Sequence, residues 1–387
     1  MTELGDIVGA SSDVDLWSDD VLNDPYPTYR QLRDQAPAVW LAKHSMVALP
    51  RFSEVREALT DWRTFSSATG VGVDPGFNAA SPPNILKSDP PEHTSFRRPL
   101  VGHLSSRGVA AVAPRVERTA AALVDDVVER DAFDVVTDLA RPYGVSVLCD
   151  LLGIDERGRE NLSAWGVESF NQYGPAGERS ARGMTATQNL IGRIAELAQP
   201  GRVAPDGWAA ELAAAGSFES LAYYVFPGID TTVNALSAAL YLFGRHPEQW
   251  QRLRDDRSLI PAAFNEVIRM HTPVHYFTRT TTAAVDVGGV EIPPRTRVLL
   301  MYGSANRDER QFADPDRFDV TRDPRDHLAF GRGVHLCAGA NLATLEGQSL
   351  IAALAERVRK FDLVSEPAWL LNHLLHGLRG LTVRALL

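Results

Sequence analysis

Residues 330–339 form a cysteine-containing turn, with the sequence Phe330-Gly331-Arg332-Gly333-Val334-His335-Leu336-Cys337-Ala338-Gly339. An apolar run with helical spacing follows, which predicts a helix over residues 338–358 with Cys337 at its N-terminus. Because a helix N-terminus stabilises negative charge, this position favours a thiolate over a thiol. Gly333 and Gly339 let the backbone approach a flat ligand, and Phe330 can shield the sulfur from water. Cys337 is therefore a candidate metal ligand; the alternative is a buried structural cysteine in a glycine turn.

The bulk composition narrows the class of protein. The 387 residues include only two cysteines, so a disulfide framework is not expected, and Cys149 is predicted to be a core residue. A net charge of -10 argues against a broad nucleic-acid surface, which needs clustered Lys and Arg. Residues 1–20 do not resemble a signal peptide, and no apolar run reaches the length of about 18 residues that a membrane span needs. We expect a cytoplasmic protein.

Helical periodicity dominates the chain. Apolar residues at three- and four-residue spacing predict helices over 26–35, 53–59, 109–130, 143–152, 218–243, 261–270 and 338–358. Strands are expected over 47–49 and within 278–298, where Gly288-Gly289 indicates a hairpin turn, and the tail 361–387 is expected to hold short strands. Loop-rich stretches at 66–89 and 174–183 are interpreted as mobile flaps. The predicted fold class is mainly α with a small β-rich region, in a single domain over 1–387.

The cysteine turn resembles the haem-binding signature of the cytochrome P450 family, Phe-x-x-Gly-x-x-x-Cys-x-Gly, and further family motifs follow the expected order over nearly the whole chain. The resemblance implies a P450 fold, haem b as the cofactor and Cys337 as the iron ligand, with Phe330, Gly331 and Gly339 beside the haem. Thiolate ligation pushes electron density onto haem iron and favours O–O cleavage, which is the handling of dioxygen expected of this family.

Glu266 and Arg269 lie one helical turn apart, so their side chains can pair. The spacing alone is a weak indication, because Glu156 with Arg159 and Glu356 with Arg359 share it. In the resembled family this pair holds the core that supports the haem, together with an arginine near Asp316-Arg317-Phe318. We expect a structural role for the pair.

The stretch Gly228-Ile229-Asp230-Thr231-Thr232 lies inside the predicted helix 218–243. An acid and a hydroxyl buried within a helix are costly unless they serve a purpose, and the alternatives are a helix N-cap or a surface Asp-Thr pair. The resemblance implies that Gly228 makes room for dioxygen, Thr231 hydrogen-bonds the bound oxygen and Asp230 relays protons. The family usually has a small residue before this glycine, whereas this chain has Pro227, which lacks a backbone donor and is expected to loosen the helix.

Two anionic haem propionates need charged or hydrogen-bonding partners. The resemblance assigns this role to four residues: His93, Arg97, Arg279 and His335. By contrast, no third ligand accompanies His373 and His376, so a separate metal site is not expected there.

Within the family, the chain resembles bacterial forms that oxidise small para-substituted aromatic acids. Those relatives bind the substrate carboxylate with an arginine just before a proline pair, where this chain has Ser81. The positions that sandwich the aromatic ring carry Phe170, Val274 and Phe277. We therefore expect a small neutral or phenolic aromatic substrate that is hydroxylated or O-demethylated, with Tyr223 or Asn84 binding its hydroxyl. A terpenoid or other secondary metabolite is the alternative.

A flavin or nicotinamide fingerprint is absent from the sequence, so electrons are expected from a ferredoxin and its NAD(P)H-dependent reductase, with Arg98 and Arg332 facing an acidic partner. The leading hypothesis is a monooxygenase using dioxygen. A peroxide-driven oxygenase and a haem sensor without turnover are the alternatives. The pair Asp230 and Thr231 argues against the peroxide-driven form, because peroxide already carries the protons needed.

Overall fold

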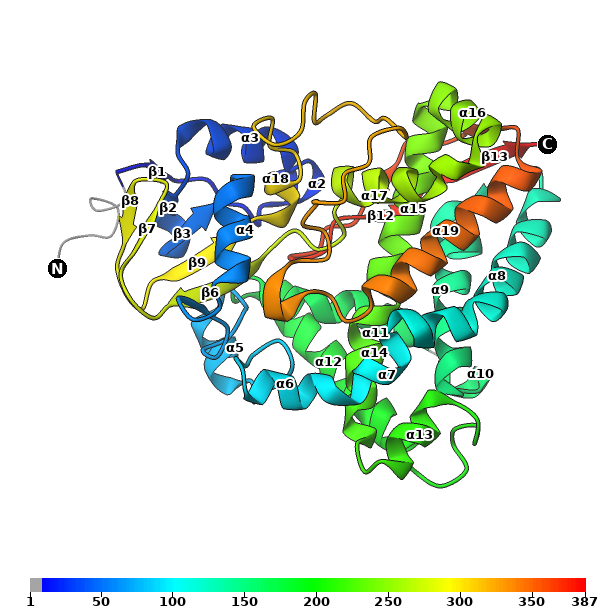
Figure 1. The fold of residues 1–387 in the computed structure, drawn as a ribbon, viewed down its shortest axis with the longest axis horizontal. Helices are drawn as coiled ribbons and strands as arrows, with labels where there is room; N and C mark the ends of the chain where they lie inside the picture. Colours follow the sequence, from blue (N-terminus) through cyan, green and yellow to red (C-terminus); the bar gives the residue numbers. More distant parts are fainter. Residues whose placement is uncertain (1–8, 160) are drawn as a thin grey trace.

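The computed structural model describes residues 9–159 and 161–387, and Figure 1 shows their arrangement. The helices are α2 Asp19–Asn23, α3 Tyr26–Gln35, α4 Phe52–Thr60, α5 Pro75–Ala80, α6 Glu92–Arg97, α7 Val101–Leu104, α8 Ser106–Val128, α9 Arg141–Leu152, α10 Glu156–Arg159, α11 Leu162–Ser169, α12 Glu178–Leu197, α13 Trp208–Ala214, α14 Ala222–Gly228, α15 Asp230–Arg245, α16 Pro247–Asp255, α17 Ile260–Met270, α18 Tyr302–Ala305 and α19 Ala340–Arg357. Short 3-10 or π-helical turns are η1 Ala42–His44, η2 Arg98–Leu100, η3 Val135–Ala140, η4 Phe170–Tyr173, η5 Phe218–Leu221, η6 Arg257–Leu259 and η7 Gly333–His335. The strands are β1 Ser11–Ser12, β2 Val39–Leu41, β3 Met46–Leu49, β4 Phe65–Ser66, β5 Phe133–Asp134, β6 Phe277–Thr281, β7 Val285–Val287, β8 Val290–Ile292, β9 Arg297–Leu300, β10 Lys360–Leu363, β11 Ala368–Trp369, β12 Leu378–Gly380 and β13 Thr382–Leu386.

The largest sheet and the long helices lie on different sides of the molecule, whereas β12 and β13 lie beside the helices (Figure 1). The β-rich region is built on a sheet with the strand order β1-β2-β3-β9-β6-β4. Here β3 and β9 run parallel, with Val47 opposite Val298, and the other neighbours of β9 and β3 are antiparallel. On the other side, α8, α9, α15, α17 and α19 pack together around one large apolar core. The mainly α fold with a small β-rich region is confirmed.

Most helices with a strong apolar stripe are confirmed within a few residues. The helix expected over 26–35 is α3, and those expected over 53–59, 109–130, 143–152 and 261–270 are α4, α8, α9 and α17. The predicted hairpin is also present, as β7 and β8 joined through Gly288 and Gly289, which have φ angles of 59° and 86°. These elements were predictable because their buried side chains recur at regular spacing.

The helix expected over 218–243 is not continuous. It consists of η5, α14 and α15, and Ile229 separates α14 from α15 with φ -95° and ψ -64°. Pro227 lies two residues before the break and has no N–H to donate to the preceding turn, which is a recognised cause of helix distortion. The prediction of one helix was wrong, and the break falls between Gly228 and Asp230.

The interpretation of 174–183 as a loop was also wrong, because α12 begins at Glu178 and continues to Leu197. Its buried face starts with the small residues Ser180, Gly183 and Ala186 before Leu190. Small residues give a weak hydrophobic pattern, so the sequence did not indicate a helix there. The stretch 66–89 is largely irregular but contains the short helix α5.

None of the helices in the part of the chain that the structure describes has both the length and the apolar character needed to cross a membrane. Cys149 is buried in the helical core, and burial raises the pKa of its thiol to about 12. The prediction that it is a core residue is confirmed.

Candidate active site

The cysteine loop holds its shape through backbone contacts. The Cys337 N–H donates to the Phe330 carbonyl at 2.8 Å, and this bond closes the turn. Gly331 and Gly333 have φ angles of 64° and 69°, which other residues rarely adopt. A Cβ at Gly333 would also lie 2.4 Å from the backbone oxygen of Leu59 on α4, so the loop packs directly against that helix.

The sulfur of Cys337 faces the N-terminal end of α19, which begins three residues later at Ala340 rather than at residue 338. Hydrogen bonds from the backbone of Gly339 and Ala340, and the charge of Arg97, favour the thiolate. Although Cys337 remains accessible, protein atoms crowd the sulfur, and burial nevertheless raises the pKa of the thiol. The helix terminus alone therefore does not ionise the thiol, in contrast to the expectation from sequence, and bonding to a metal must supply the rest.

The four residues assigned to the propionates converge from separate elements. His93 and Arg97 lie on α6, Arg279 on β6 and His335 on η7. The rings of His93 and His335 have centroids 4.4 Å apart. Burial first, and then the charges of Arg279, His93 and Arg97, lowers the pKa of His335 to about 3.

These residues fit a dianionic group at this position. The Nε2 atoms of His93 and His335 are buried and have no hydrogen-bond partner among the described residues. Arg97 donates to the Leu336 carbonyl at 2.7 Å, beside the cysteine loop, and Arg279 donates to the Thr278 carbonyl at 2.8 Å. Unpaired buried donors and two guanidinium groups next to a cysteine ligand match the needs of haem propionates.

The Glu266 and Arg269 pair is confirmed as a buried structural unit. Their side chains are 0% exposed, with Arg269 Nε 2.6 Å from Glu266 Oε2. The supporting arginine is Arg322, whose Nε lies 3.0 Å from Glu266 Oε1. The sequence pointed instead to the segment around Arg317, but the Arg317 side chain is 64% exposed and pairs with Asp319. The expected segment was therefore close, and among the described residues Arg322, four residues beyond it, is the arginine outside the pair that reaches Glu266.

An acid and two hydroxyl residues, Asp230, Thr231 and Thr232, follow the helix break, and each side chain has a different partner. The Thr231 hydroxyl donates to the Pro227 carbonyl at 2.8 Å, and the Thr232 hydroxyl lies 3.2 Å from Glu346 Oε2 on α19. Asp230 is 3% exposed, and burial raises the pKa of its carboxyl group to about 7. An acid with a pKa near neutrality can both hold and release a proton at physiological pH.

Gly228 lies at a close contact between two helices. A Cβ built there would lie 2.9 Å from Leu148 Cδ2 on α9. The glycine therefore allows α14 to pack closely on α9, and its role beside dioxygen stays a prediction.

The residues predicted to bind substrate fall into two groups. Phe170, Val274 and Phe277 meet in the same apolar cluster, which also contains Leu375. Tyr223 packs against the helical core, and the backbone of Ile85 hydrogen-bonds its hydroxyl. The Asn84 amide is used within its own loop, accepting from Leu86 N at 2.9 Å and Lys87 N at 3.0 Å. The amide oxygen of Asn84 is therefore engaged within its own loop.

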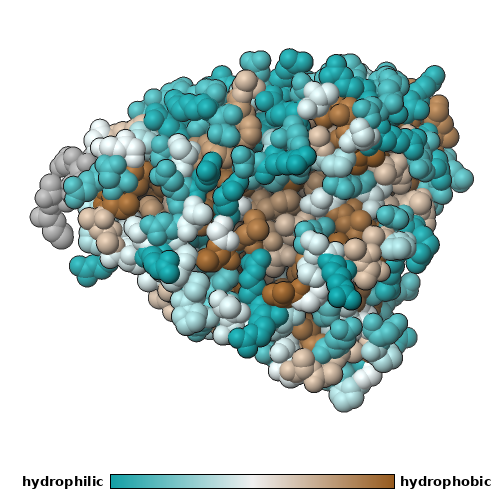
Figure 2. Space-filling model, viewed as in Figure 1, coloured by the Kyte–Doolittle hydropathy of each residue, from teal (hydrophilic) through white to brown (hydrophobic). Residues whose placement is uncertain are grey.

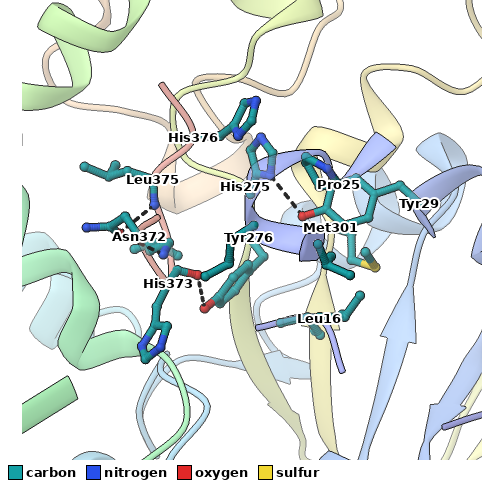
Figure 3. A pocket seen from close by; sticks show the side chains of 14 residues that line it. Leu16, Pro25, Tyr29, His275, Tyr276, Met301, Asn372, His373, Leu375 and His376 are labelled. Atoms are coloured by element: carbon teal, nitrogen blue, oxygen red, sulfur yellow. Dashed lines mark hydrogen bonds between the residues drawn. The ribbon is translucent and has the colours of Figure 1, made fainter. Parts of the chain in front are cut away.

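A small cavity of about 20 Å³ is lined by the N-terminal helices, His275 and Tyr276, the end of β9 and the segment 372–376 (Figure 3). Its polar groups include His275, whose Nδ1 hydrogen-bonds the Tyr29 hydroxyl at 2.9 Å, and His376. Nε2 of each histidine is buried without a partner in the described part of the chain. A polar cavity of this size suits an ordered water rather than a substrate. Among the described residues, neither His373 nor His376 belongs to a group suited to hold a metal ion.

Two groups were missed from sequence. Ser163 on α11 bonds the Asp230 carboxylate, and Glu346 on α19 meets Thr232. Glu346 interrupts an apolar helical run, which could have marked it as a buried acid. The sequence around Ser163 gives no comparable indication, because its partner Asp230 is distant in the chain.

A cysteine beside a helix terminus, a group of histidines and arginines suited to two carboxylates, and an acid–threonine pair at a helix break are the features expected of a haem-thiolate protein. A family model described as Cytochrome P450 matches residues 219–368. Cytochrome p450 CYP199A2 of Rhodopseudomonas palustris is 36% identical, over 96% of this chain and 93% of its own length. The 6-deoxyerythronolide B hydroxylase of Saccharopolyspora erythraea is 34% identical over 96% of this chain and 98% of its own. The solved structure of CYP109Q5 from Chondromyces apiculatus has a TM-score of 0.83 and 29% identity, covering 97% of this chain and 98% of that chain.

The chain belongs to the cytochrome P450 family. It is accordingly an oxidoreductase of the monooxygenase type, with haem b as its cofactor.

Proposed function

We propose that this monooxygenase hydroxylates or O-demethylates a small neutral or phenolic aromatic compound, using dioxygen and electrons from a separate ferredoxin and its reductase. The observation that carries the proposal is the meeting of Phe170, Val274 and Phe277 in one apolar cluster, in a chain whose neighbouring loop offers no free cation. Aromatic side chains around a few polar groups are typical of a pocket for a small planar ligand.

The loop that would hold a substrate carboxylate carries one cation, Lys87. Its ammonium group donates to the carbonyl oxygens of Asn78 and Ser81, within the same loop. Because these bonds already engage the ammonium group, Lys87 is not equivalent to the missing arginine. Tyr223 is then the remaining polar group for a substrate hydroxyl, and burial raises the pKa of its phenol, which keeps it a neutral donor.

When bound by Cys337, the haem iron supplies the activation of dioxygen. The residues of the chain supply positions and protons. Asp230, with a pKa of about 7, can hold a proton, and Thr231 follows it in the chain with its hydroxyl donating to the Pro227 carbonyl. We assign proton delivery to Asp230 and Thr231, and haem anchoring to His93, Arg97, Arg279 and His335.

The proposed partner surface is the face that carries the cysteine loop. Figure 2 shows apolar side chains near the middle of this face, where the loop and α7 lie in Figure 1. Val101 and Leu336 are 58% and 44% exposed, and Arg98, three residues before Val101, is exposed as well. Arg332 contributes less than expected, since its guanidinium pairs with Asp326 at 2.7 Å. An apolar centre beside basic residues suits a small acidic redox protein.

Substrate binding tests the proposal. Methoxyphenols are expected to displace the iron-bound water and shift the haem absorption at lower concentration than benzoates, because no free cation awaits a carboxylate. Tyr223→Phe should weaken the binding of methoxyphenols about tenfold or more. The affinity for methoxybenzenes that lack a hydroxyl should stay unchanged. The tightest ligand is then turned over with a surrogate ferredoxin, its reductase and NADH. Tighter binding of benzoates, or product formed from hydrogen peroxide but never from the ferredoxin system, would contradict the proposal.

A further inference from the structure

The carboxyl group of Asp230 is held by a helix other than its own. The Ser163 hydroxyl on α11 donates to Asp230 Oδ1 at 2.8 Å, and both residues are buried, at 6% and 3% exposure. Oδ2 is also buried and has no hydrogen-bond partner among the described residues. Ser163 is therefore the one side chain found to hydrogen-bond this acid in the described part of the molecule.

A glycine on the same helix provides the space for the second oxygen. A Cβ built at Gly166 would lie 2.1 Å from Asp230 Oδ2, which is closer than any real contact. Gly166 is one turn after Ser163 on α11, so the two positions share a face of the helix. The carboxyl group of Asp230 thus lies against the backbone of α11, and the Ser163 hydroxyl hydrogen-bonds to it.

Among the described residues, one charged group acts on the acid. Arg141 on α9 favours the ionised carboxylate, as does the Ser163 hydrogen bond, whereas burial favours the protonated acid most strongly. Arg141 has a buried Nε without a partner in the described residues, so it acts on Asp230 through its charge and not through a direct bond. A shift of α11 would therefore act on the Asp230 carboxyl group through its hydrogen bond with Ser163.

We propose that Ser163 is a positioning residue for the proton-delivering acid, gripping the Asp230 carboxyl group against the backbone of α11 at Gly166. This proposal rests on the role assigned above to Asp230. Because α11 runs directly into Phe170 of the apolar cluster, a shift of α11 moves the acid and the substrate wall together.

Infrared difference spectroscopy of the haem-loaded protein tests this without turnover. The C=O band of the protonated Asp230 carboxyl group is followed against pH, and it is assigned by its loss in Asp230→Asn. Ser163→Ala should raise the midpoint of this titration by about one pH unit, because a donor that stabilises the carboxylate is lost. Ser163→Thr, which keeps a hydroxyl, should restore the midpoint of the unaltered protein.

Ser169→Ala is the matched control. Ser169 is a buried serine of the same helix, but its hydroxyl donates to the Gly166 carbonyl at 2.7 Å instead of to Asp230. Equal midpoints in Ser163→Ala and the unaltered protein, or equal shifts in the Ser163 and Ser169 variants, would overturn the proposal. If Ser163→Ala does not fold, Gly166→Ala replaces it: the added methyl should displace the carboxyl group and shift its band, and an unmoved band would also overturn the proposal. Since no substrate or electron donor is used, a wrong substrate assignment leaves the result unaffected.

Discussion

At the scale of single residues, Glu266 shows how much a buried charge depends on its neighbours. Its Oε1 accepts from Arg269 Nη2 at 2.8 Å and from Arg322 Nε at 3.0 Å, while Oε2 accepts from Arg269 Nε at 2.6 Å. The third guanidinium nitrogen of Arg269, Nη1, donates to the Asn306 carbonyl at 2.8 Å. Removing one member of such a set leaves a buried charge without compensation.

Glu266→Gln is therefore expected to lower the free energy of unfolding by about 3 to 5 kcal/mol, with loss of bound haem as the protein loosens. Denaturant unfolding of the haem-loaded protein measures this. Glu356→Gln is the control, because Glu356 pairs with Arg257 at 3.4 Å in an ion pair whose side chains are 50% and 51% exposed. Exposed pairs contribute little, so this variant should unfold like the parent. Equal stability of the two variants would refute the assigned structural role.

At the scale of elements, the cysteine loop and α4 are locked by a backbone contact that leaves no room for a side chain. Gly333 combines a φ of 69° with the close approach to the Leu59 oxygen. Gly289, in the β7–β8 hairpin, has a φ of 86° but nothing within 4 Å of the position of a Cβ. Both glycines thus have a positive φ, which an alanine would adopt only with strain. They differ in whether an added Cβ would collide with a neighbouring backbone atom.

Gly289→Ala should cost about 1 kcal/mol of stability through strain alone. Gly333→Ala should cost distinctly more and should also disturb the sulfur ligation, because the loop must move away from α4. The reduced carbon monoxide spectrum reports the ligation: a fraction of the protein is expected to lose the red-shifted band of a sulfur-bound haem. A Gly333→Ala variant with the parent's spectrum and the stability of Gly289→Ala would show that the contact with Leu59 is unimportant.

At the scale of the whole molecule, buried histidines join the N-terminal helices to the C-terminal strands. His271, His275 and His376 surround Tyr26, with ring centroids 6.0, 6.1 and 5.4 Å from it. The Arg307 guanidinium stacks 3.6 Å from the centre of the Tyr26 ring. Burial first, and then this positive charge, lowers the pKa of His376 to about 3, and burial lowers the pKa of the other two as well.

These pKa values predict acid sensitivity. A histidine with a pKa near 6.5 when unfolded and about 3 when folded is neutral in the native state at pH 7. As the pH falls below about 6.5 the unfolded chain takes up the proton first, so stability falls until the folded pKa is reached. For His376 alone the loss is about 3 kcal/mol by about pH 4.

The prediction is checked by comparing stability at neutral and acidic pH in the parent and in His376→Gln. The variant should lose less stability on acidification, even if it is less stable at neutral pH. His246→Gln is the control, since the His246 side chain is 39% exposed. If all three proteins lose the same amount of stability on acidification, the prediction is contradicted, because carboxyl groups alone would then account for the loss.

What the sequence determined by itself is local. The cysteine turn, the regular amphipathic helices such as α3 and α17, the hairpin at Gly288-Gly289 and the pairing of Glu266 with Arg269 all depend on residues near one another in the chain. Helical spacing and turn geometry follow from the backbone, so these features could be read without knowing the neighbours.

Only the tertiary structure decided the partners. It showed that Arg322, and not Arg317, completes the Glu266 group, that Gly228 packs against Leu148, and that Ser163 grips Asp230. It also showed that α14 and α15 are separate helices, and that the Asn84 amide is used within its own loop. Each of these features is a contact between residues that the packing of whole helices and loops brings together. The spacing of residues along the sequence does not predict such contacts.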